Sequence, residues 1–71
     1  MAADMRSVFS SHIDKIGHDP GTNELFVQWQ KGKTSVYGNV TPDKARTIMN
    51  APSVGEAIDK YVKPFHPHRY A

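Results

Sequence analysis

The chain has no cysteine among its 71 residues. Disulfides and thiolate zinc sites are therefore excluded as sources of stability, which is typical of a protein from a reducing compartment. A chain of this length buries only about 60% of the surface that its unfolded form exposes, so its core must be thin. The apolar residues on which we expect that core to depend are Leu25, Val27, Trp29, Ile48 and Ile58.

Long hydrophobic runs are also missing, both at the N-terminus and further along the chain. We therefore expect neither a signal peptide nor a membrane-spanning helix. We therefore expect a soluble, cytoplasmic protein without a membrane partner. The formal net charge is only +2, which permits contact with nucleic acid without arguing for it.

Recognised catalytic motifs are absent as well. The sequence has no cysteine nucleophile, no glycine-rich phosphate loop and no familiar acid–base spacing. Its carboxylates occur mostly where turns and first helical turns favour them, as at Asp19, Asp43 and Glu56. We predict that the protein is not an enzyme, has no catalytic residues and needs no cofactor.

The clearest β pattern is ELFVQWQ, residues 24–30, which places Leu25, Val27 and Trp29 on one side. Lys31 and Gly32 can form a two-residue hairpin turn, after which residues 33–40 return as a strand. An earlier strand is expected within residues 8–17, although its alternation is poor. The sequence HDPGTN, residues 18–23, predicts the turn between these two strands.

A two-residue turn fixes the pairing of the hairpin, because register follows loop length. Gln28 would face Ser35, Val27 would face Val36, and Phe26 would face Tyr37. Val36 would then lie on the core face of the sheet. Ser35 and Tyr37 would lie on the opposite face, which is half aromatic and half polar.

Two helices are predicted after this hairpin. Thr41 can cap the first, with Pro42 at its first position, and the helix stops at residues 50–52. Ser53 and Glu56 form a capping-box pattern for the second, which ends before Pro64. The predicted fold is α+β, a three-stranded antiparallel β-meander followed by two short α-helices packed on the sheet. Residues 1–7 would form a flexible lead-in and residues 8–71 a single domain.

Two single residues also lead to expectations. Trp29 should lie in or near the core, where its indole N–H would need a hydrogen-bond partner. Gly55 stands in the first turn of the second predicted helix, although an interior glycine costs about 1 kcal/mol relative to alanine. Close approach of another backbone, or a partner pressing there, would explain that glycine.

Three stretches of the chain resemble the KTSC domain: SSHIDKIGHD, ELFVQWQKGKTSVYGNV and NAPSVGEAIDKYVK. This small module occurs at the C-terminus of some lysyl-tRNA synthetases and as stand-alone proteins in bacteria and phages. The resemblance covers roughly residues 10–70. The family's tyrosine-any-tyrosine motif falls on Ser35 and Tyr37, so only its second tyrosine is present. RNA is the ligand class that the resemblance implies, through the fusion to the synthetase.

The C-terminal sequence KPFHPHRY, residues 63–70, could be a nucleic-acid-binding arm, a metal site or a clamp that closes the core. His66 and His68 would point the same way in an extended segment, but a structural zinc site normally needs four ligands. We therefore predict no metal site. Because Pro64 ends the preceding helix, the segment should run back along the sheet, with Phe65 buried and Arg69 exposed.

These observations predict a small non-enzymatic module that binds single-stranded or structured RNA. Aromatic side chains would stack on unpaired bases while cations neutralise phosphates. The alternative is a protein-interaction module, such as a phage or prophage accessory protein that binds a host protein complex. The sequence does not decide the oligomeric state between a monomer and a homodimer. The candidate nucleic-acid-binding residues are Phe26, Gln28, Lys31, Lys33, Tyr37, Lys63, His66, His68 and Arg69.

Overall fold

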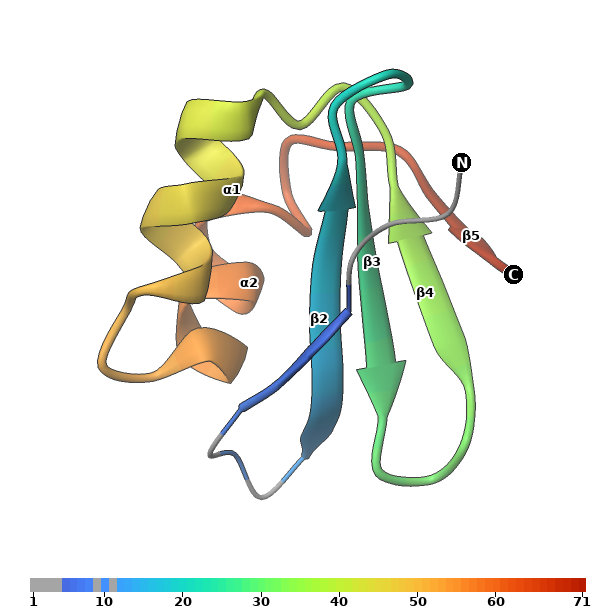
Figure 1. Ribbon diagram of the computed structural model, residues 1–71, viewed down its shortest axis with the longest axis vertical. Coiled ribbons are helices and arrows are strands. Elements are labelled where there is room, and N and C mark those ends of the chain that lie inside the picture. Colours follow the sequence, from blue (N-terminus) through green and yellow to red (C-terminus); the bar gives the residue numbers. More distant parts are fainter. Residues whose placement is uncertain (1–4, 9, 11) are drawn as a thin grey trace.

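The computed structural model describes residues 5–8, 10 and 12–71 of the chain. These residues form a five-stranded antiparallel sheet with two helices over one of its faces (Figure 1). The predicted α+β class with two helices is confirmed, whereas the predicted number of strands is wrong. The elements in chain order are β1 (Arg6–Ser7), β2 (Ile13–Asp19), β3 (Glu24–Trp29), β4 (Thr34–Tyr37), α1 (Pro42–Met49), α2 (Val54–Tyr61) and β5 (His68–Tyr70).

The two strands that the prediction missed lie at the two edges of the sheet. β1 pairs with β2, although Arg6 and Ser7 belong to the expected lead-in, residues 1–7. Residues 1–4 of that lead-in lie outside the described residues. β5 pairs with β4, so the C-terminal segment does run back along the sheet. Strands of two or three residues are too short to show the alternation that identifies a strand in a sequence.

A β-bulge explains the poor alternation of β2. Ile13 pairs with Trp29 and Lys15 pairs with Gln28, so the register shifts between them and Asp14 is the extra residue. The bulge turns both Ile13 and Ile16 to the helix-covered face, although they are three positions apart. Both side chains are fully buried there.

The hairpin between β3 and β4 has a loop of three residues, 30–32, and not the predicted two. The backbone N–H of Trp29 donates to Lys33 O at 2.8 Å, and that of Gly32 donates to Trp29 O at 2.9 Å. Gly32 has a φ of 98°, as in a turn that ends in a left-handed residue. A two-residue turn of the favoured type needs positive φ at both positions, which is unfavourable for Lys31.

The longer loop shifts the register by one residue and exchanges the two faces of β4. Tyr37 pairs with Leu25, and Ser35 pairs with Val27. Ser35 and Tyr37 therefore lie on the helix-covered face, and their predicted place beside Phe26 and Gln28 is wrong. Val36, predicted for the core face, instead pairs with Phe26 on the opposite face.

Both helices begin at the predicted caps. Thr41 Oγ1 accepts from the backbone N–H of Lys44 at 3.3 Å, and Ser53 Oγ accepts from that of Glu56 at 3.4 Å. Apolar residues of both helices pack on the sheet to form a single core. Its buried members are Ile13, Ile16, Leu25, Val27, Tyr37, Val40, Ala45, Ile48, Val54, Ala57, Ile58 and Val62.

The segment after α2 is fastened to the end of β4 at Gly38. The Gly38 N–H donates to Pro67 O at 2.9 Å, and His66 Nδ1 lies 2.9 Å from Gly38 O. Phe65, which we expected to be buried, is 70% exposed. Val62 already closes the core, and Phe65 falls in the turn that follows it, so its ring is left in solvent. Arg69 is exposed, as predicted.

Among the residues that the structure describes, no helix is both long enough and apolar enough to cross a membrane.

Candidate functional site

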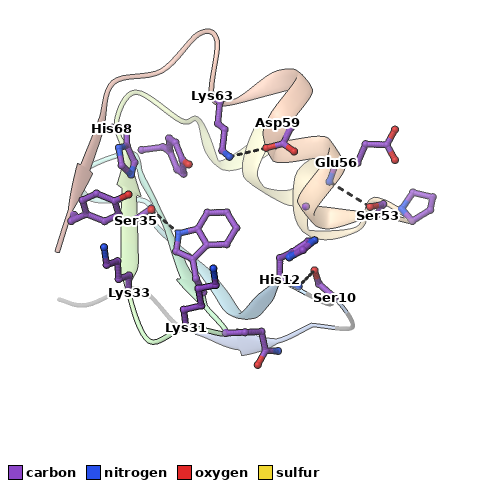
Figure 2. A pocket seen from close by; sticks show the side chains of 16 residues that line it. Ser10, His12, Lys31, Lys33, Ser35, Ser53, Glu56, Asp59, Lys63 and His68 are labelled. Atoms are coloured by element: carbon purple, nitrogen blue, oxygen red, sulfur yellow. Dashed lines mark hydrogen bonds and ion pairs between the residues drawn. The ribbon is translucent and has the colours of Figure 1, made fainter.

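An open groove of about 1120 Å³ lies on the helix-facing side of the sheet, beside α2. The hairpin between β3 and β4 and the C-terminal strand β5 provide its other walls (Figure 2). The side chains that β5 presents to this face, His68 and Tyr70, are exposed to solvent.

The floor of the groove contains a hydrogen-bonded pair from β3 and β4. Trp29 Nε1–H donates to Ser35 Oγ at 2.7 Å. This confirms that the indole needs a partner near the core. Ser35 is almost completely buried, with an exposed fraction of 2%. The bond fixes the orientation of the indole, so that the ring forms a rigid part of the groove.

Three rings extend from the floor along β4 and β5. The centroid of Tyr37 lies 5.1 Å from that of His68, and His68 lies 4.7 Å from Tyr70 in an edge-to-face arrangement. Tyr37 is buried, and this burial raises the pKa of its phenol above the ordinary value. Tyr37 therefore stays neutral at physiological pH. Tyr70, at the outer end of the row, is 62% exposed.

Lysine ammonium groups lie over two aromatic rings of the groove, those of Tyr70 and Trp29. Lys33 Nζ lies 5.3 Å from the ring centroid of Tyr70, and Lys63 Nζ lies 5.5 Å from that of Trp29. Such contacts attract a cation to the face of a ring. Lys63 also pairs with Asp59, one helical turn earlier, at 2.9 Å, and this bond raises the pKa of Lys63.

The charges along the groove are unevenly balanced. On the α2 side, Asp59 pairs with Lys63 and Glu56 pairs with Lys60 at 3.0 Å. On the hairpin side, Lys31 and Lys33 form no ion pair with any residue in the described part of the chain. Figure 2 shows Lys31 and Lys33 on one side of the groove and Asp59 with Glu56 on the other. The hairpin side is therefore the electropositive side.

At the far end, Gly55 lines the groove beside Ser10 and His12. A Cβ at Gly55 would lie 3.8 Å from Ser10 Oγ and 3.9 Å from Ile13 Cδ1, which are ordinary contact distances. Close approach of another backbone, one explanation offered for this glycine, is therefore wrong. Gly55 lies on the wall of the groove, where the other explanation, contact with a partner, stays a prediction.

The structure brings five of the predicted nucleic-acid-binding residues together in this groove. They are Lys31, Lys33, Tyr37, Lys63 and His68. Sequence reasoning missed Trp29, Tyr70 and Asp59 as members of the site. Trp29 and Tyr37 share a face only in the corrected register, and Tyr70 joins them only because β5 pairs with β4.

The other four predicted residues lie elsewhere. Phe26 and Gln28 project from the opposite face of the sheet, as the pairing of β3 requires. Arg69 lies on that face too and binds Glu24 at 2.8 Å. His66 contacts Gly38 O and Lys44 Nζ, at 2.9 and 2.8 Å. His66 and His68 thus face different neighbours instead of pointing the same way.

These features define a class of protein, a small α+β domain whose sheet carries an open aromatic groove beside a helix. The model of the KTSC domain family matches residues 9–66. The chain therefore belongs to the KTSC domain family, as its sequence indicated.

Relatives and a solved structure agree with this assignment. The chain is 33% identical over 60 residues to a protein of Tsukamurella paurometabola, and the aligned stretch covers 84% of this chain and 90% of the relative. It is 31% identical over 61 residues to an uncharacterized protein of Stutzerimonas stutzeri, covering 86% of this chain and 84% of the relative. The crystal structure of a KTSC domain protein from Yersinia pestis has a TM-score of 0.89 and 31% identity, covering 99% of each chain.

Proposed function

We propose that the protein is a non-enzymatic module that binds single-stranded RNA in the groove between α2, the β3–β4 hairpin and β5. The observation that carries the proposal is the joint placement, in one open groove, of aromatic rings and of two lysines that form no ion pair within the described part of the chain. Proteins that bind single strands combine the same two elements, rings that stack on bases and cations that follow the phosphates.

The charge distribution favours an anionic ligand over a cationic one. The carboxylates of the α2 side are already paired with lysines, whereas Lys31 and Lys33 have no carboxylate partner in the described part of the chain. A phosphate backbone would therefore lie along the hairpin. Bases would point from there toward Trp29 and Tyr70, and would take the positions that the ammonium groups of Lys63 and Lys33 occupy in the free protein.

Two features support binding over catalysis. The groove is open, so it does not exclude water from a reacting group. Within the described residues, the side-chain hydrogen bonds of histidine rings go to backbone carbonyls and Lys44, and none goes to a carboxylate. The oriented histidine–carboxylate pair on which many acid–base sites depend is thus not formed there.

Trp29 supplies a direct test, because it is the sole tryptophan of the chain and lines the groove. Titration with mixed single-stranded RNA at low salt should change its fluorescence, since a base stacked on the indole quenches emission. Binding should weaken steeply as salt increases, because phosphate contacts release counterions. If RNA leaves the emission unchanged and shows no binding by anisotropy, the proposal is wrong.

A pair of double variants locates the contact. Lys31→Gln with Lys33→Gln should weaken binding and lower the slope of log affinity against log salt by about 1.4, at about 0.7 for each phosphate contact. Lys15→Gln with Arg46→Gln removes the same charge from exposed positions outside the groove and serves as the control. Equal losses in the two double variants would show that the net charge, and not the groove, binds RNA.

A protein partner is the second candidate, and the exposed rings of Phe65 and Tyr70 support it. A packed protein interface should respond less to salt than phosphate contacts do. Pull-down from the native host, with and without nuclease, separates the two candidates. Partners that remain after nuclease treatment and are lost with Phe65→Ser would favour the protein interface over RNA.

A further inference from the structure

The contacts of Asp59 in the free protein raise the question of which bases the groove prefers. Asp59 Oδ1 lies 2.9 Å from Lys63 Nζ, and the same ammonium group lies 5.5 Å from the ring centroid of Trp29. One lysine thus connects the carboxylate to the face of the ring on which a base would stack. Asp59 is the carboxylate that shares this ammonium group with the ring of Trp29.

A base that stacks on Trp29 has to displace this ammonium group. Lys63 has a long, flexible side chain and can move to a phosphate, where its charge is again compensated. Asp59 then loses its hydrogen-bond donor inside a groove that the ligand has partly closed to water. A carboxylate left in that state is unfavourable unless the ligand donates to it.

The four bases differ in how well they can donate. Guanine presents an N–H and an amino group side by side, which suit a carboxylate, and cytosine and adenine each present one amino group. Uracil presents one N–H between two carbonyl oxygens, which would repel Asp59. Carboxylates accept from the cytosine amino group in nucleic-acid complexes for the same reason.

We propose, on the basis of the proposed RNA-binding function, that Asp59 makes the groove selective for bases with an amino group on the Watson–Crick edge. Guanine is preferred and uracil is disfavoured. Glu56 faces the groove from the same helix, but its carboxylate is held by Lys60, which does not line the groove. Displacing Lys63 therefore leaves Glu56 paired, and Glu56 does not select the base.

The test compares short single-stranded RNAs of equal length and charge, made of uracil alone, of cytosine alone, of adenine alone, or of uracil with guanine. Fluorescence anisotropy is measured at one salt concentration for the wild type, Asp59→Asn and Glu56→Gln. The wild type should bind the uracil oligomer about tenfold more weakly than the guanine-containing one, as expected for a good hydrogen-bonded pair. Both side chains are well exposed on α2, so both variants should fold, and circular dichroism checks this.

Uracil also stacks less well than the purines, so the wild-type preference alone does not identify Asp59 as its cause. The decisive quantity is the ratio of the affinities for the guanine-containing and the uracil oligomers, and how each variant changes it. Both variants remove one negative charge and should bind the uracil oligomer more tightly. Only Asp59→Asn should bring the ratio close to one, because an amide can donate to uracil as well as accept. Three results would overturn the proposed base selectivity and leave the proposed RNA binding standing. They are an unchanged affinity ratio in Asp59→Asn, an equal change of that ratio in Glu56→Gln, and equal affinities of the wild type for both oligomers. Absence of binding to every oligomer would overturn the proposed function, and the selectivity with it.

Discussion

Tyr37 and Tyr70 belong to the same row of rings but have different relations to the core. Tyr37 is 2% exposed and packs with the core, whereas Tyr70 is 62% exposed at the end of the chain. His68 lies between them. A substitution of Tyr37 therefore tests the stability of the fold, and a substitution of Tyr70 tests the groove.

We expect Tyr37→Ala to lower the free energy of unfolding by about 3 kcal/mol or more, the range for a buried aromatic residue. Tyr70→Ala should change it by less than about 1 kcal/mol, because the ring is exposed. Urea denaturation followed by circular dichroism measures both values. Tyr70→Ala should also weaken RNA binding by about 1–3 kcal/mol through the loss of a stacked base. Equal stabilities of the two variants would contradict the assignment of Tyr37 to the core and of Tyr70 to the groove.

At the scale of elements, an ion pair connects β5 to β3 across β4. Arg69 Nη2 lies 2.8 Å from Glu24 Oε2 on the face of the sheet opposite the groove. The hydrogen bond from Arg69 lowers the pKa of Glu24, and a second hydrogen bond from Thr22 contributes. A carboxyl pKa that is lower in the folded protein means that the ionised form stabilises the fold.

The pair predicts that β5 is held less firmly at acidic pH. Its contribution is complete above the unfolded pKa of a glutamate, about 4.3, and is lost as the pH falls through the lower value of the folded protein. Amide chemical shifts of Arg69 and Tyr70, measured by NMR between neutral and acidic pH, should follow this titration. Glu24→Gln should remove the transition in that window, and persistence of the transition in the variant would assign it to another carboxyl group.

For the whole molecule, the core and the groove depend on different parts of the chain. The last residue of the buried core is Val62. The groove also needs His68 and Tyr70, which contribute rings but little buried surface. The fold should therefore tolerate the loss of β5 better than binding does.

We expect a chain truncated after Pro67 to keep its fold and to lose most of its RNA affinity. Far-ultraviolet circular dichroism should retain the helical signal, with a lower melting temperature because the edge of β4 and part of Tyr37 become exposed. Anisotropy with single-stranded RNA should show the loss of binding, and Arg69→Ala in the full chain serves as the control for the lost charge. Unfolding of the truncated chain, or wild-type affinity, would contradict the separation of core and groove.

The sequence alone determined the features that depend on near neighbours. Thr41 and Ser53 predicted where both helices begin, because a cap bonds to a backbone N–H a few residues away. The alternation of Leu25, Val27 and Trp29 predicted the central strand. The motifs of the KTSC family predicted the family to which the chain belongs.

Only the tertiary structure decided which residues meet in the groove. The third loop residue of the hairpin moved Ser35 and Tyr37 to the face of Trp29, and loop length is poorly specified when Lys31 stands where asparagine would fix it. β5 then brought His68 and Tyr70 beside Tyr37, a pairing between segments about thirty residues apart. Such contacts depend on how the chain returns on itself, which no local pattern of residues encodes.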